Sequence, residues 1–260
     1  TDILRAAIVL GFLFVDEAHE LPLLYGLLFA QMSVGIFFDA ARSASVPNTI
    51  APEDLHVAYT LSAATWSVML ALGAGLGGLL LTVVGLEGVF LIDSVTYLVS
   101  AVFVIWLRLP PTPTPEAPLH WADIFLLRDI RRAVQHLREH QALHFALAKF
   151  FWGACGGFVV MISIIGKVRF APLFGADAAA AGLATSLLYM ARGFGTGIGP
   201  LLARRFSGGS DQALLRQIFL GYFVGAFGYA IFAPLNSLPL ALCAIVFAHC
   251  GGSALWVAST

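Results

Sequence analysis

The sequence predicts an all-α membrane protein, a polytopic helical bundle made of two parallel halves that repeat one another. Of its 260 residues, 59% are hydrophobic and 11% are charged, and the mean hydropathy is +0.88. Soluble globular chains are about 45–50% apolar and about 25% charged. Because the apolar excess runs along the whole chain, a single buried core could not absorb it. Bilayer-length apolar stretches and an internal repeat complete the prediction.

Eight apolar stretches are long enough, or nearly so, to cross a bilayer as helices. Such a helix needs about 20 residues. Glu87 and Gly88 predict a tight turn between the third and fourth stretches. The expected spans are residues 3–15, 22–46, 58–84, 89–107, 145–165, 181–203, 214–234 and 238–258.

The longest polar stretch, residues 109–143, lies between the fourth and fifth spans. It opens with a run of prolines, which cannot continue a helix. From 124 to 143 the apolar residues recur at helical spacing beside a basic face, which predicts an amphipathic helix on a membrane surface. We therefore expect an N-terminal half at 1–108 and a C-terminal half at 144–260, joined by this connector.

The distribution of basic residues predicts the orientation, because cytoplasmic loops of membrane proteins carry excess Lys and Arg. With the connector in the cytoplasm, the acidic loop at residues 16–20 falls outside. Lys167 and Arg169 also fall outside and are the exceptions to the pattern. The basic residues that fall inside are Arg5, Arg204, Arg205 and Arg216.

An internal repeat relates the first two spans to the last two. The matching segments are 4–12 with 215–222 (one residue deleted), 21–23 with 238–240, 29–31 with 247–249, and Gly35 with Gly252. Chance similarity between apolar helices is the alternative. A real repeat implies two six-helix halves running in the same direction, a plan typical of transporters. On that plan the chain lacks two helices at each end.

Two of the few charges at membrane depth are candidates for a substrate or ion pathway, because such charges usually face a partner or a wet cavity. Asp93 shares a stripe of the fourth span with Thr96, Tyr97 and Ser100. It is a candidate proton or cation site, although a capping or interface role fits equally well.

Arg192 lies near the middle of the sixth span, too deep to reach the membrane surface easily. Helical spacing places Thr185, Tyr189 and Thr196 on its face. Arg192 could therefore bind an anionic substrate or neutralise an acidic partner, with Tyr189 and Thr196 beside it.

Asp39 and Arg42 lie three residues apart near the inner end of the second span. They could form a structural ion pair at the rim or a gating contact. In the third span, Gly73, Gly77 and Gly78 would allow close helix packing or a hinge.

No soluble-enzyme motif is present: the sequence has no P-loop, HExxH, GxSxG or metal-spaced His/Cys cluster. We therefore expect no enzymatic activity, no cofactor, no metal and no nucleic-acid partner. The expected partners are the lipid bilayer and a small-molecule substrate.

Several motifs resemble the major facilitator superfamily, in particular its enterobactin-exporter-like and macrolide-efflux-like branch. Residues 37–47 and the loop after them are similar to that branch's fourth helix and following loop. The glycines at 73, 77 and 78 match its antiporter motif Gly-Pro-x-x-Gly-Gly, with Ala74 in place of the proline. Gly199, Arg204 and Arg205 resemble the second-half copy of its cytoplasmic loop motif.

The resemblance covers helices three to ten of twelve and implies a secondary transporter in the plasma (bacterial inner) membrane. It implies alternating access, with proton entry driving export of a siderophore or drug-like compound. The alternatives are an importer of a small metabolite on the same fold and a non-transporting membrane scaffold or sensor. Arg192 in a dry ion pair would favour the scaffold.

Overall fold

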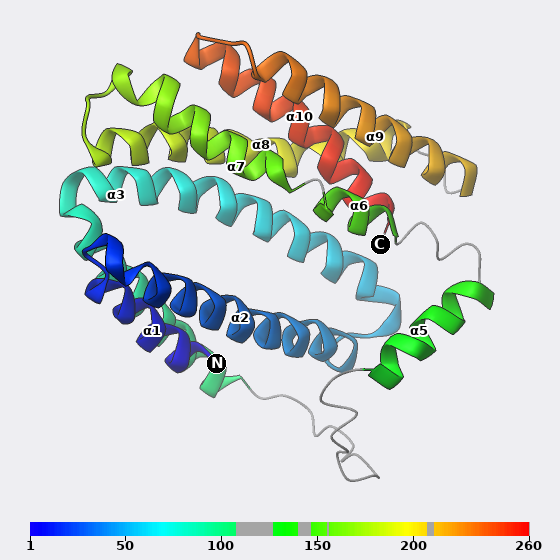
Figure 1. Ribbon diagram of the computed structural model, residues 1–260. Coiled ribbons are helices and arrows are strands. Elements are labelled where there is room, and N and C mark those ends of the chain that lie inside the picture. Colours follow the sequence, from blue (N-terminus) through cyan, green and yellow to red (C-terminus); the bar gives the residue numbers. More distant parts are fainter. Residues whose placement is uncertain (108–126, 140–146, 155, 207–210, 260) are drawn as a thin grey trace. The chain divides into compact units, whose positions relative to one another are not determined.

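The computed structural model describes residues 1–107, 127–139, 147–154, 156–206 and 211–259, together with most of their side chains. All the regular structure in these residues is helical (Figure 1). The α-helices are α1 (Asp2–Gly11), α2 (Leu21–Thr49), α3 (Leu55–Trp106), α5 (Leu127–Glu139), α6 (Leu147–Ala154), α7 (Gly157–Ile165), α8 (Ala178–Phe206), α9 (Asp211–Phe232) and α10 (Leu238–Ala258). The prediction of an all-α membrane fold is confirmed.

Five segments of the described chain are long and apolar enough to cross a membrane. They are Ala18–Thr49, Ala64–Trp106, Phe150–Leu173, Gln212–Phe232 and Leu238–Ala258. The predicted spans at 3–15 and 181–203 are helical but fall outside this set. The first corresponds to α1, which has 10 residues. The second lies in the 29-residue α8, whose apolar sequence is interrupted by Arg192 and several glycines.

The segment Ala64–Trp106 has 43 residues, about 65 Å of helix, which is roughly twice the thickness of the hydrocarbon core. Gly85 interrupts it with φ 72° and ψ 179°, a conformation that only glycine adopts readily. The chain turns back there (Figure 1), so α3 contains two spans. The predicted turn at Glu87 and Gly88 was therefore misplaced, because both residues are helical and follow the break.

The predicted span 145–165 is also interrupted, because α6 ends at Ala154 and α7 begins at Gly157. The amide of Gly156 donates a hydrogen bond of 2.9 Å to the carbonyl of Gly153, which closes a tight turn. The glycines at 153, 156 and 157 favour such an interruption, because glycine weakens a helix.

The chain divides into two compact units. Unit 1 comprises Thr1–Ala63 and Leu76–Thr112, and unit 2 comprises Ala64–Gly75 and Pro113–Thr260. The predicted division into 1–108, 109–143 and 144–260 stays a prediction. Within the predicted connector, the described helix is α5.

In unit 1, α1 packs against α2 and against the second part of α3. The Ser94 hydroxyl donates to the Ala6 carbonyl at 3.1 Å, and the rings of Phe12 and Phe90 stack at 5.5 Å. These contacts hold α1 against α3, and Gly11 packs closely on Leu27 of α2.

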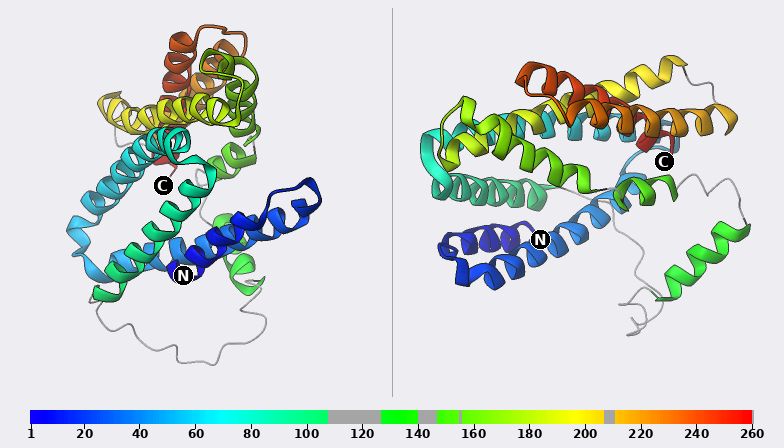
Figure 2. Two further views of the ribbon diagram at one scale, coloured as in Figure 1. Left: turned by 90° about the vertical axis from the view of Figure 1, so that its left-hand side faces the viewer. Right: turned by 45° about the horizontal axis from the view of Figure 1, so that its top comes forward.

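In unit 2, α8 and α9 flank α10 and bury one side of it each (Figures 1 and 2). Glycines make the close approach possible, since they remove the side chains that would separate two helices. A Cβ on Gly195 of α8 would collide with the Val246 carbonyl of α10, and one on Gly228 of α9 would meet Ala248 at 2.6 Å. The aromatic and aliphatic core beside this contact includes Leu188, Phe232 and Ile245.

The two helices at the predicted repeat begin in the same way. Both α2 and α10 start at the first leucine of a Leu-Pro-Leu sequence, with the proline in the first turn. Proline is well tolerated there, because the first turn of a helix needs no amide donor. This shared start pairs residue 31 with residue 248, one residue away from the repeat's pairing of Gln31 with His249.

Candidate functional site

Unit 1 contains a polar group at the meeting of three helices, which we call the Arg5 cluster: Arg5 of α1, Gln31 of α2 and Tyr97 of α3. The guanidinium carbon of Arg5 lies 4.4 Å from the Tyr97 ring centroid. The Gln31 amide donates to the Tyr97 hydroxyl at 3.1 Å. Gln31 is 9% exposed, and neither its Oε1 nor Arg5 Nε has a hydrogen-bond partner among the described residues.

The stripe predicted on α3 consists of Asp93, Thr96, Tyr97 and Ser100, and of these only Tyr97 belongs to the Arg5 cluster. Asp93 and Thr96 are exposed, and the Thr96 hydroxyl donates to the Asp93 carbonyl at 2.7 Å. Asp93 interacts electrostatically with Arg5 without a short ion pair. Ser100 instead donates to the buried Asp2 carboxylate at 2.6 Å.

Unit 2 contains a second polar group, which we call the Arg192 cluster: Tyr189 and Arg192 of α8, Tyr229 of α9 and His249 of α10. The Arg192 guanidinium carbon lies 5.7 Å from the Tyr189 ring centroid, and its Nε is buried without a hydrogen-bond partner. The Tyr229 hydroxyl and His249 Nε2 are 2.7 Å apart, and His249 is 2% exposed. The charge of Arg192 acts electrostatically on both.

The structure shows the contacts of two residues that were predicted to lie beside Arg192 on α8. Helical spacing correctly placed Tyr189 beside Arg192, and the Tyr189 hydroxyl also lies 3.3 Å from the Ser163 hydroxyl of α7. The Thr196 hydroxyl, however, donates to the carbonyls of Arg192 and Gly193 in its own helix, at 2.9 Å and 2.8 Å. The Thr196 hydroxyl therefore has its hydrogen-bond acceptors within α8.

The remaining predicted site residues lie apart from both clusters. Arg42 forms an ion pair of 3.6 Å with Asp39, and their side chains are 50% and 70% exposed. A Cβ on Gly73 or Gly77 would meet no described atom within 4 Å, and Gly78 is buried. Gly199 packs closely on Cys250 and Ser253 of α10. The side chains of Arg204 and Arg205 lie outside the described residues.

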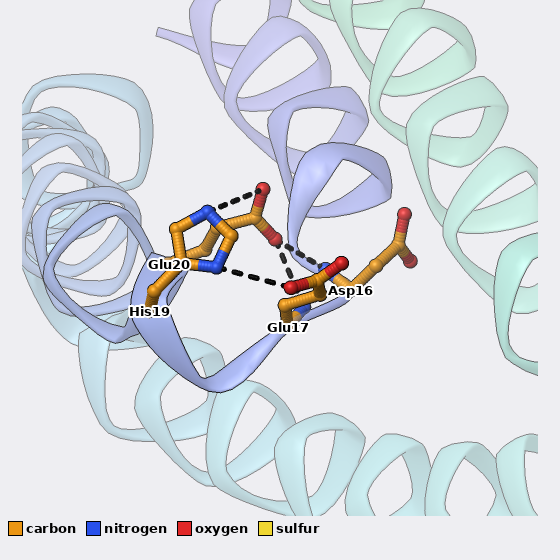
Figure 3. Close-up of polar contacts among 4 residues, drawn as sticks. All are labelled: Asp16, Glu17, His19 and Glu20. Carbon is orange, nitrogen blue, oxygen red and sulfur yellow. Dashed lines mark hydrogen bonds and ion pairs between the residues drawn. The ribbon is translucent and has the colours of Figure 1, made fainter.

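The acidic loop between α1 and α2 forms its own hydrogen-bonded turn (Figure 3). The amides of Asp16 and Glu17 donate to one Glu20 carboxylate oxygen at 2.7 Å and 3.0 Å. His19 Nδ1 lies 3.2 Å from the Glu17 carboxylate. These exposed contacts stabilise the entry into α2.

Sequence analysis did not propose Arg5, Gln31, Tyr229 or His249 as site residues. One signal was available for two of them. The repeat aligned Gln31 with His249, and each of these residues is hydrogen-bonded to a tyrosine in its own unit.

The fold is that of a helical membrane protein with polar clusters between its helices. The family model of the Major Facilitator Superfamily matches residues 3–260, and the chain belongs to this superfamily. It is 24% identical over 177 residues to the uncharacterized MFS-type transporter YkuC of Bacillus subtilis (strain 168), covering 66% of the chain and 41% of YkuC. It is 33% identical over 140 residues to the candidate bacilysin exporter BacE of Bacillus amyloliquefaciens, covering 54% of the chain and 32% of BacE.

The chain therefore spans less than half the length of the curated relatives that it matches. No solved structure matches the chain. Membership in the superfamily confirms the resemblance that the motifs predicted and agrees with the membrane-length helices of the structure.

Proposed function

We propose that this protein is a secondary active transporter that exports a small organic compound, siderophore-like or drug-like, by alternating access and in exchange for protons. The observation that carries the proposal is the state of Arg192. It lies well inside α8, and no ion pair joins it to a carboxylate in the described part of the chain. An arginine at membrane depth is costly, so an unneutralised one is expected to serve a ligand.

The comparisons support export over the alternatives. BacE is described by its name as a candidate bacilysin exporter, and YkuC as a transporter. The scaffold alternative required Arg192 to be neutralised in a dry ion pair, and the described residues provide none.

Asp93 is the candidate proton site. Its carboxylate is near enough to Arg5 to interact electrostatically but forms no short ion pair with it. A proton on Asp93 would remove this attraction, and the Arg5 cluster would then be free to rearrange. The Asp39–Arg42 pair is proposed as a contact at the rim of the membrane, and Gly73, Gly77 and Gly78 as the packing hinge.

The proposed location is the plasma (bacterial inner) membrane, with the connector 109–143 in the cytoplasm. In α5 the apolar Ile130 and Val134 are exposed at 56% and 44% beside exposed Arg131 and Arg138. A helix with an apolar and a basic face can lie on an anionic lipid surface.

The proposal is tested by accumulation of a panel of dyes and siderophores in inside-out membrane vesicles, with and without an imposed proton gradient. We expect gradient-dependent accumulation by the wild type and its loss in Arg192→Ala. Arg216→Ala, which removes an exposed arginine of α9, is the matched control and should retain it. Accumulation only in right-side-out vesicles would contradict export, and no gradient-dependent movement in either orientation would contradict transport.

A further inference from the structure

The interruption between α6 and α7 places aromatic side chains next to the Arg192 cluster. Trp152 lies in the last turn of α6 and Phe158 in the first turn of α7, with ring centroids 5.2 Å apart. Gly156, which precedes α7, keeps right-handed helical backbone angles (φ −56°, ψ −6°), and its amide is hydrogen-bonded to the Gly153 carbonyl. The interruption is therefore a local tightening of the helical path.

The aromatic rings continue from this interruption to α9 and α10. Phe158 lies 5.3 Å from the Tyr229 ring at 38° and 5.6 Å from the His249 ring at 67°. Tilted and edge-on contacts at these distances are favourable between aromatic rings. Phe158, Trp152 and Tyr229 are only partly buried, so a further flat ring has aromatic surface to pack against.

The fixed charge beside these rings is positive. Arg192 provides it, and the other members of the cluster are a histidine and two tyrosines. The buried Arg192 Nε has no hydrogen-bond acceptor among the described residues. A buried donor without an acceptor is unfavourable, and a carboxylate is the acceptor that a guanidinium binds best, because the two are matched in shape and charge.

The Tyr229–His249 pair adds two polar side chains, each of which can donate or accept a hydrogen bond. Tyrosine hydroxyls and neutral imidazoles both donate and accept hydrogen bonds. Their 2.7 Å contact fixes both side chains from different helices, α9 and α10. The pair is therefore held in position to meet a polar atom on a ligand bound beside Phe158.

We propose that unit 2 holds a binding site for an aromatic carboxylate, whose ring packs on Phe158 and Trp152 and whose carboxylate binds Arg192. The inference deepens the proposed function by naming the class of substrate, and its transport consequence rests on that function. Binding itself does not require transport, so the two are tested separately.

The test is binding of four probes to the purified full-length protein in detergent, by isothermal titration. Benzoate has the ring and the charge, benzamide the ring alone, cyclohexanecarboxylate a charged but non-flat ring, and acetate the charge alone. We expect benzoate to bind at least about tenfold more tightly than each of the other three. Equal affinity for benzoate and benzamide, or no binding of benzoate, would overturn the proposal. This ranking depends on no variant.

Variants assign the site to its residues. Arg192→Gln should abolish the preference for benzoate over benzamide, and Phe158→Leu should reduce the preference for benzoate over cyclohexanecarboxylate. His249→Gln keeps a hydrogen-bonding group and copies the residue found at the matching position in unit 1. It should weaken benzoate binding less than Arg192→Gln does, because it removes no charge from the site. Arg42→Gln removes an exposed arginine and should change nothing. Benzoate binding unaffected by Arg192→Gln would overturn the proposed site.

Transport separates failure of the site from failure of the proposed function. Benzoate binding by a protein that moves nothing in vesicles would contradict the transporter and leave the site intact. Gradient-driven transport of cationic dyes that benzoate does not compete with would support the transporter and contradict the site.

Discussion

At the scale of single residues, Arg169 shows why a basic side chain lies on the side predicted to be outside. Its guanidinium Nη1 donates to the carbonyls of Ala233 at 2.6 Å and Leu235 at 2.9 Å. These carbonyls follow the end of α9, where they lack helical partners. Arg169 is therefore a cap for the turn between α9 and α10, and its position follows from this contact and not from the charge distribution of the loops.

Arg169→Leu should lower the free energy of unfolding by about 2 kcal/mol, because two carbonyls lose a charged donor. The measurement is thermal or denaturant unfolding in detergent. Lys167→Met is the control, since the Lys167 side chain is exposed and forms no hydrogen bond with the other described residues. Equal loss of stability in the two variants would contradict the capping role.

The hydrogen bonds between residues of different helices were the part of the site that the sequence could not predict. Tyr189 and Arg192 are three apart on a helix, so spacing alone placed them together. Gln31 and Tyr97 come from different helices, as do Tyr229 and His249. Such partners meet only when the helices are packed, and a single sequence holds no direct record of that packing.

At the scale of helices, glycine sets the distance between α8 and its neighbours. A Cβ on Gly193 would collide with the backbone of Ala71, and one on Gly195 with the carbonyl of Val246. Backbone atoms in a helix cannot move away from an added Cβ, whereas the end of a flexible side chain can. The sequence predicted close packing from the glycines of the third span, whereas the tight contacts use Gly75 and the glycines of α8.

Gly195→Ala should therefore destabilise unit 2 by about 1–3 kcal/mol, the usual cost of overpacking. Gly73→Ala is the matched control, because its Cβ would meet open space and alanine favours a helix. The comparison of unfolding midpoints in detergent measures both. A stable Gly195→Ala protein with an unchanged midpoint would show that α8 and α10 are farther apart than the structure places them.

Helix ends were harder to predict than helices. Apolar length identified the spanning segments, because crossing the hydrocarbon core requires that length. The breaks at Gly85 and at residues 154–157 depend on local backbone conformations, and several glycines nearby could equally have hosted them. Near the second break, Phe158 lies against both Trp152 and His249.

At the scale of the whole molecule, the composition and the internal repeat were sufficient to predict a polytopic helical membrane protein. The match to the superfamily model confirmed this class of protein. The repeat also offers a comparison between the units. In each unit an arginine lies over a tyrosine ring. In unit 1 that same tyrosine is hydrogen-bonded to Gln31, and in unit 2 a second tyrosine is hydrogen-bonded to His249. In unit 1 the carboxylate of Asp93 interacts with the arginine, while the described members of the Arg192 cluster beside Arg192 are two tyrosines and a histidine. We therefore propose that Asp93 carries the proton and that Arg192 binds the anionic substrate.

The most direct test of this assignment is accumulation of radiolabelled benzoate in inside-out vesicles carrying the full-length protein, with an acidic lumen. We expect gradient-dependent accumulation by the wild type and by Arg216→Gln, which removes an exposed arginine, and none by Arg192→Gln. Accumulation by Arg192→Gln at the wild-type rate would contradict the central claim that Arg192 holds the substrate.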